Sequence, residues 1–261
     1  MILEAAELVA VPTRARGRAD DAMEPRVLPG AAAGWPAASR WTFDFLRRCF
    51  ADSPVVLSDD VGAPSKHLKV RFAAYADYCL GDTLALPPPP GASPWYLGNW
   101  DIFADAPELA DDFTLPEGVE DHMPGWGSDP RWHFGRFGWL FVGPAGTRSF
   151  PHRDLFATHA WIAQLQGTKR VRLAAYEQVA AANKAGRDRT VDWAWEAELK
   201  AGDVLLIPAM MLHEAESNEP SISLSFNYVD DRNEVLVRQA VAADPDRWAR
   251  KIAGAGVVWP A

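Results

Sequence analysis

The sequence predicts a mainly β domain, a sandwich or barrel, flanked by helices. From Phe137 onward, short apolar or alternating runs are separated by turns that contain glycine or proline, a pattern typical of antiparallel sheets. The segment 221–229 alternates most clearly, with apolar residues on one face and serines with Asn227 on the other. On both sides of these strand-like runs, apolar residues recur with helical spacing.

Composition and charge narrow the class of protein. The 261 residues are 48% hydrophobic, enough for the core of one large domain. The net charge of −9 and the absence of any long lysine or arginine run argue against nucleic acid as a partner. No apolar run approaches the roughly 20 residues that span a bilayer, so no membrane association is expected. The start of the sequence lacks the layout of a secretory leader, so Cys49 and Cys79 are interpreted as reduced core thiols of a cytoplasmic protein.

The first half of the chain predicts a few helices and a long irregular segment. Residues 1–40 are rich in alanine, proline, glycine and arginine and are expected to be weakly structured. Four consecutive prolines at 87–90 force an extended linker. The segment 101–135 is acidic and then rich in glycine, tryptophan and proline. It is interpreted either as a substrate lid or as a segment held by aromatic packing. The regular elements expected before the linker are a helix over 41–50, a strand over 54–58 and a helix over 70–80.

The second half predicts the sheets and two final helices. Strands are expected at 138–142, 158–166, 169–173, 203–208 and 221–229, and helices at 234–242 and 244–253. The chain is therefore divided into a weakly structured segment (1–40), a β domain with N-terminal helices (41–230) and C-terminal helices (231–261). The last helices either pack on the barrel or form a homodimer interface.

Three separated side chains suggest a metal site. His152 and Asp154 form a His-x-Asp triplet, although about one such triplet is expected by chance with 6 histidines and 35 acidic residues. Because residues i and i+2 of a strand share a face, both side chains can point into a barrel. His213 follows the predicted strand 203–208, and closure of the barrel would bring it in from the opposite sheet. Two imidazoles and a carboxylate are the set that holds Fe(II) on one face and leaves the other face open to O2. The alternative is that no metal binds: His152 and Asp154 would then interact locally in a loop, and His213 would cap the end of a strand.

Lys169 is the second candidate functional residue. It follows the turn Gly167-Thr168 and begins a predicted strand. Lysine is rarely buried unless it is paired, so an inward Lys169 could meet the distal carboxylate of a diacid bound to the metal. The alternative is an exposed lysine at a turn.

These residues lie within a pattern that resembles a known family. The stretch 149–170, the sequence Gly-Asp-Val-Leu-Leu-Ile-Pro at 202–208, His213 and the triplet 225–227 are similar to the core of JmjC/cupin-like Fe(II)- and 2-oxoglutarate-dependent oxygenases. The resemblance runs from about residue 93 to residue 229. It implies a double-stranded β-helix of the jelly-roll or cupin type.

The resemblance also implies the roles of the site residues. His152, Asp154 and His213 would hold Fe(II), with 2-oxoglutarate and O2 as co-substrates. The implied cosubstrate-binding residues are Lys169 for the C5 carboxylate, Ser149 and Tyr96 as hydrogen-bond donors to it, and Asn227 lining the site. Two positions differ from patterns known in relatives: Ile162 stands where many JmjC-like proteins carry asparagine, and Ser223 stands where other 2-oxoglutarate oxygenases carry an arginine for the distal carboxylate.

The activity implied by the resemblance is hydroxylation of a C–H bond in a peptide or protein side chain, with succinate and CO2 as co-products. The alternatives are a hydroxylase of a small molecule in specialised metabolism, an inactive JmjC-like binding module, and a metal-binding cupin without a diacid cosubstrate. Demethylation through hydroxylation of an N-methyl group is also chemically open.

Overall fold

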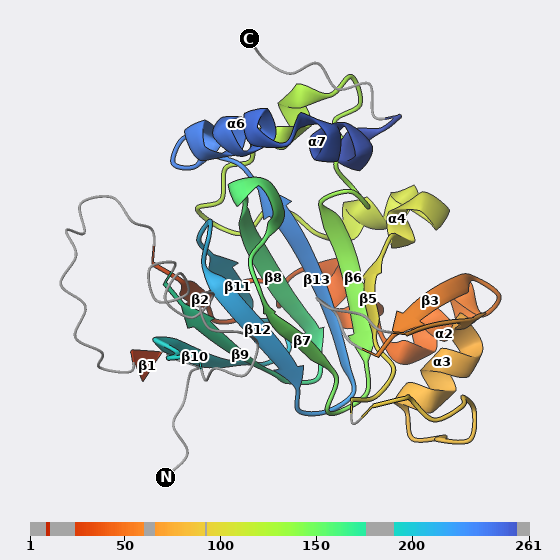
Figure 1. Ribbon diagram of the computed structural model, residues 1–261. Coiled ribbons are helices and arrows are strands. Elements are labelled where there is room, and N and C mark those ends of the chain that lie inside the picture. Colours follow the sequence, from red (N-terminus) through yellow and green to blue (C-terminus); the bar gives the residue numbers. More distant parts are fainter. Residues whose placement is uncertain (1–8, 11–23, 60–65, 92, 176–190, 255–261) are drawn as a thin grey trace.

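The alternating runs fold into two antiparallel sheets that face each other at the centre of the molecule (Figure 1). The computed structural model describes residues 9–10, 24–59, 66–91, 93–175 and 191–254. Within these residues the first sheet has the strand order β1 (Val9–Ala10), β10 (Trp195–Leu199), β9 (Lys169–Ala174), β12 (Leu212–Ser217) and β7 (Arg148–His152). The second sheet has the order β2 (Arg26–Leu28), β11 (Val204–Ile207), β8 (His159–Gln166), β13 (Ser221–Tyr228), β6 (Gly138–Gly143) and β5 (Leu97–Trp100). From β6 to β13 the strands alternate between the two sheets, except that β9 and β10 are neighbours in the first sheet, and this is the topology of a double-stranded β-helix.

The strand β13 shows how the sequence pattern sets the fold. Every residue of this strand is buried. Its apolar members, such as Leu224 and Phe226, join the main hydrophobic core on the outer face of the second sheet. Its polar members, such as Ser223 and Ser225, face the space between the sheets. The serine face of this strand therefore lines a cavity inside the barrel and does not face bulk solvent.

The N-terminal helices cover the outer face of the second sheet. They are α1 (Pro36–Arg40), α2 (Phe43–Phe50) and α3 (Phe72–Cys79), with a hairpin of β3 (Pro54–Ser58) and β4 (His67–Arg71) beside them. Thr42 caps α2 by accepting a hydrogen bond from the backbone N–H of Phe45 at 3.1 Å. The hydroxyl of Tyr75 donates to the carbonyl of Val142 at 2.7 Å and accepts from the N–H of Leu97 at 3.0 Å, which ties α3 to β5 and β6.

The segment 1–40 was expected to be weakly structured, and this prediction is wrong for residues 24–40, which the structure describes. Residues 26–28 pair with β11, and Trp35 packs edge-on against Trp161 with ring centroids 5.8 Å apart. Short strands and helices of this kind have too few residues to show a period in the sequence. Residues 1–8 and 11–23 of the same prediction lie outside the described residues. Cys49 also departs from prediction, because it is exposed on α2; Cys79 is buried as expected.

The C-terminal helices appear where they were predicted and lie across one end of the barrel (Figure 1). They are α6 (Glu234–Ala243) and α7 (Pro245–Ile252). Trp248 of α7 packs with Trp126 and Phe137. The remaining short helices are α4 (Ile102–Asp105), η1 (Pro107–Asp112), η2 (Met123–Trp126) and η3 (Leu155–Ala157). Among the described helices, none combines the length and apolarity needed to cross a bilayer. A homodimer through α6 and α7 stays a prediction.

Candidate active site

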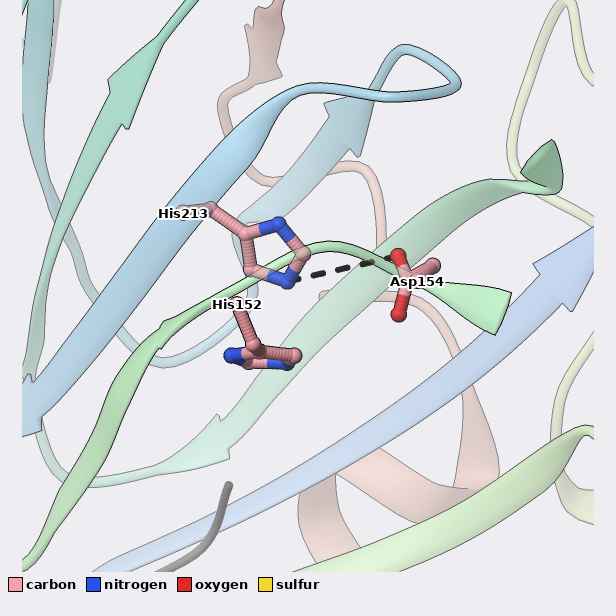
Figure 2. Close-up of side chains that lie close together, drawn as sticks. All are labelled: His152, Asp154 and His213. Carbon is pink, nitrogen blue, oxygen red and sulfur yellow. Dashed lines mark ion pairs between the residues drawn. The ribbon is translucent and has the colours of Figure 1, made fainter. Parts of the chain in front are cut away.

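Neighbouring strands bring the two candidate metal histidines together. The strands β7 and β12 pair antiparallel with His152 directly opposite His213, and their ring centroids are 4.3 Å apart. His152 is the last residue of β7, and Asp154 follows it in an extended conformation, with φ −62° and ψ 155°. Figure 2 shows the two imidazoles and the carboxylate gathered around one point. The prediction that His213 comes from the opposite sheet is wrong, because residues 212–217 form a strand of the same sheet that was not recognised.

The three side chains form a compact ligand set. One ligand atom from each of His152, Asp154 and His213 lies within 4.8 Å of the other two. Nε2 of His213 is 4.0 Å from Oδ2 of Asp154, the pair joined by the dashed line in Figure 2. One metal ion can therefore be reached by all three groups with small side-chain movements.

Hydrogen bonds to the backbone set the tautomers of both imidazoles. Nδ1 of His152 donates to the carbonyl of Phe150 at 2.8 Å, and Nδ1 of His213 donates to the carbonyl of Met211 at 3.2 Å. Because a carbonyl can only accept, each Nδ1 carries the proton and each Nε2 keeps a lone pair for a metal. Burial, and then the neighbouring His152, lower the pKa of His213 to about 4, so it is the neutral, ligating form at neutral pH. The donor set therefore fits a divalent iron ion.

Lys169 lies at the start of β9 and is 3% exposed. Its Nζ donates to the hydroxyl of Ser223 at 2.7 Å and lies 3.4 Å from the hydroxyl of Tyr96. Ser223 in turn donates to Oε1 of Gln164 at 2.7 Å. No ion pair in the described part of the chain includes Lys169, and burial lowers its pKa to about 7. The alternative of an exposed lysine is wrong, and the surroundings suit a carboxylate ligand.

A cavity of about 450 Å³ connects the metal set with the lysine. All of the residues predicted for the site line it, namely His152, Asp154, His213, Lys169, Ser149, Tyr96 and Asn227. Their hydrogen bonds differ: Oγ of Ser149 accepts from the N–H of Ala215 at 3.0 Å, and the amide of Asn227 donates to Oγ1 of Thr158 at 3.0 Å. The roles assigned to these residues remain predictions, whereas their meeting in one cavity is observed.

The long segment before β6 does not line this cavity. The lining includes Asn99 and Phe137 but none of the described residues between them. Met123, Trp126 and Trp132 pack instead with Trp248 in a separate apolar cluster. Of the two interpretations of this segment, the structure favours aromatic packing over a lid.

Sequence reasoning missed two lining residues, Arg247 and Lys251. It also did not single out Gln164, which accepts the hydrogen bond from Ser223. The spacing of Arg247 and Lys251 shows that they share a side of one helix, but nothing in the sequence shows which way that side faces.

Comparisons with known proteins agree with this geometry. Residues 135–235 match the JmjC domain. The chain is 27% identical over 149 residues to the "Bifunctional arginine demethylase and lysyl-hydroxylase psr-1" of Caenorhabditis elegans, covering 56% of this chain and 34% of that protein. It is 24% identical over 232 residues to the "Arginine-specific demethylase JMJ22" of Arabidopsis thaliana, covering 80% of this chain and 43% of that protein. It is 25% identical over 231 residues to the "Jumonji C domain-containing protein 5" of Drosophila melanogaster, covering 79% and 55%.

The fold and the ligand set define a double-stranded β-helix protein with a candidate metal site. Together with the match over residues 135–235 and the similarity to these relatives, they support a JmjC domain of the Fe(II)- and 2-oxoglutarate-dependent oxygenase type in this chain. The chain spans between about a third and just over half of the length of these relatives.

Proposed function

We propose that this protein is an Fe(II)- and 2-oxoglutarate-dependent oxygenase that hydroxylates a C–H bond of a peptide or protein side chain. The observation that carries the proposal is the meeting of His152, Asp154 and His213 with the buried Lys169 in one cavity. The reaction balances as 2-oxoglutarate, O2 and R–H giving succinate, CO2 and R–OH. One oxygen atom enters succinate and the other enters the product.

The residues of the chain have separate tasks in this reaction. The Nε2 atoms of His152 and His213 and the carboxylate of Asp154 would hold Fe(II), which supplies the oxygen activation that couples decarboxylation of the cosubstrate to oxidation of the C–H bond. Lys169 binds the C5 carboxylate and fixes the orientation of 2-oxoglutarate. Tyr96, 3.4 Å from Nζ of Lys169, is placed to donate a hydrogen bond to the same carboxylate.

Apolar walls keep the cosubstrate end of the cavity dry. Ile162, Ile207 and Phe141 line it. A dry pocket strengthens the attraction between Lys169 and a carboxylate, because fewer water molecules compete for either charge. Exclusion of water and orientation of the cosubstrate are the contributions of the protein itself.

The names of the relatives support a protein substrate and add demethylation as a second candidate. Two of them are named as arginine demethylases, and one of these also as a lysyl-hydroxylase. Hydroxylation of an N-methyl group gives a product that releases formaldehyde, so one site serves both outcomes.

The test is a turnover assay with product analysis. The protein is incubated without oxygen with Fe(II) and 2-oxoglutarate, then given O2 and a pool of peptides, some of them methylated. Mass spectrometry is expected to show one added oxygen, or loss of a methyl group with formaldehyde, in proportion to succinate. A variant with Asp154→Ala is the control and should form neither product.

Three results would overturn the proposal. Failure of the wild-type protein to form succinate under all conditions, with intact Fe(II) binding, would favour a binding module. Iron binding that 2-oxoglutarate does not strengthen would favour a cupin without a diacid cosubstrate. Oxidation of metabolites but of no peptide would favour the small-molecule hydroxylase.

A further inference from the structure

The charges around the cavity are strongly unbalanced. Its charged lining residues are Arg153, Lys169, Arg247 and Lys251 on the positive side and only Asp154 on the negative side. Asp154 belongs to the candidate metal set, so its charge would be used to hold the metal ion. The whole chain carries a net charge of −9, which makes this concentration of cations a local feature of the site.

Two of the cations come from α7, the helix that lies over the end of the barrel (Figure 1). Arg247 and Lys251 are four residues apart and therefore lie on the same side of the helix. Nζ of Lys251 is 4.4 Å from the ring centroid of Trp139, and the guanidinium carbon of Arg247 is 5.9 Å from that of Phe156. Neither side chain takes part in a salt bridge within the described residues.

The α7 cations and Lys169 occupy different positions along the cavity. Nζ of Lys169 is 6.0 Å from the ring centroid of Phe141, whereas Lys251 covers the ring of Trp139. Trp139 and Phe141 are alternate residues of β6, so they share a face and are about 7 Å apart along the strand. Lys169 therefore lies at the buried end of the cavity, whereas the α7 cations are more exposed to solvent.

A second hollow adjoins the main cavity. It has a volume of about 470 Å³ and shares His152, Asp154 and Arg247 with the main cavity. A small acid would fill one of the two hollows, whereas an extended chain can occupy both. This continuity favours a peptide over a small metabolite.

We propose that Arg247 and Lys251 are specificity-determining residues that bind a carboxylate of the substrate, so that the enzyme selects peptides with aspartate or glutamate next to the oxidised residue. The inference rests on the proposed function and adds the substrate class. The inferred substrate also differs from those in the names of the relatives, because a positively charged arginine or lysine side chain would be repelled by Arg247 and Lys251. Burial and then the nearby Arg136 lower the pKa of Lys251 to about 8, and an incoming carboxylate would relieve this cost.

The experiment measures peptide binding apart from turnover. Full-length protein is loaded with 2-oxoglutarate and Mn(II), which replaces Fe(II) without supporting turnover, and titrated against three labelled peptides of equal length that are acidic, neutral or basic. Fluorescence anisotropy is expected to show at least tenfold tighter binding of the acidic peptide than of the basic one, with a loss of this preference in high salt.

Charge reversal tests the residues themselves. The double variant Arg247→Glu/Lys251→Glu is expected to prefer the basic peptide. Arg250→Glu, an exposed position of α7 that lines neither hollow, is the matched control and should keep the wild-type preference. Circular dichroism of each variant establishes that it is folded.

The outcomes separate this inference from the proposed function. Equal affinity for the three peptides, or a preference that the double variant leaves unchanged, overturns the inference alone. Displacement of the acidic peptide by N-acetylglutamate at equal concentration also overturns it, because the ligand is then a small acid. The affinity for 2-oxoglutarate should stay the same in the double variant and fall in Lys169→Ala; an unchanged affinity in Lys169→Ala contradicts the proposed function instead.

Discussion

Replacement of Lys169 by methionine should stabilise the cosubstrate-free protein and strongly weaken its binding of 2-oxoglutarate. Burial moves the pKa of this lysine from 10.5 to about 7. At about 1.4 kcal/mol per pKa unit, burial of the charged amine costs on the order of 5 kcal/mol. Methionine has a similar length and no charge, and Ser223 keeps its hydrogen bond to Gln164. We expect the free energy of unfolding to rise by about 1–4 kcal/mol.

The stability gained by Lys169→Met depends on pH, because the pKa of Lys169 is 10.5 in the unfolded chain and about 7 in the folded protein. Below pH 7 the amine is charged in both folded and unfolded chains, and the wild-type protein bears the whole cost of burial. Between about pH 7 and 10.5 only the unfolded chain keeps the proton, so the cost falls as the pH rises. The advantage of Lys169→Met should therefore be largest below pH 7 and decline steadily above it.

The same substitution should weaken cosubstrate binding, although it stabilises the cosubstrate-free protein. Loss of one partner of a buried ion pair costs about 3–5 kcal/mol, which is a loss of affinity of between about a hundredfold and several thousandfold. Urea unfolding with and without 2-oxoglutarate measures both effects on one protein. Lys169→Arg keeps the charge and serves as the comparison. A destabilised Lys169→Met protein, or one that still binds 2-oxoglutarate as tightly as the wild type, would refute the reasoning.

Three further changes have definite expected outcomes. His152→Ala leaves two ligands, so Fe(II) affinity and succinate formation should be lost while thermal unfolding stays close to that of the wild type; a retained Co(II) absorption spectrum would contradict this. Gly167→Ala should destabilise the protein by more than about 1 kcal/mol in urea unfolding, because φ is +75° and a Cβ would lie 2.2 Å from the carbonyl oxygen of Pro220. Tyr75→Phe leaves the N–H of Leu97 without its buried acceptor and should cost about 1–3 kcal/mol, with no change in the affinity for 2-oxoglutarate.

Much of the barrel could be predicted because its strands are amphipathic or wholly apolar. The predicted strand 221–229 became β13 and 169–173 became β9, since alternation over five or more residues leaves little ambiguity. β12 was missed because its sequence, Leu-His-Glu-Ala-Glu-Ser, has too few apolar residues to mark a face. β2 was missed because it has only three residues and depends on its partner β11.

The same limits explain what the sequence showed about the site. Spacing placed His152 and Asp154 on one face, and the turn placed Lys169 at a strand start. The partner of His152 was assigned to the wrong sheet, because register between strands far apart in sequence depends on packing that no local pattern reveals. The cations of α7 were missed for a related reason: the orientation of a terminal helix is set by the cluster around Trp248, which forms only in the folded protein.

The two sheets contribute different parts of the candidate site. The first sheet supplies the metal set from β7 and β12 and the lysine from β9, whereas the inner face of the second sheet supplies the floor from β6 and β13. Along β13, Leu224 packs in the core while Ser223 faces Lys169, so one alternation builds both the core and the anion site. A shift of β13 by a single residue would bury Ser223 in the core and place Leu224 against the amine. The cosubstrate site therefore depends on the apolar packing behind it, and loss of that packing should weaken 2-oxoglutarate binding even where no lining residue is changed.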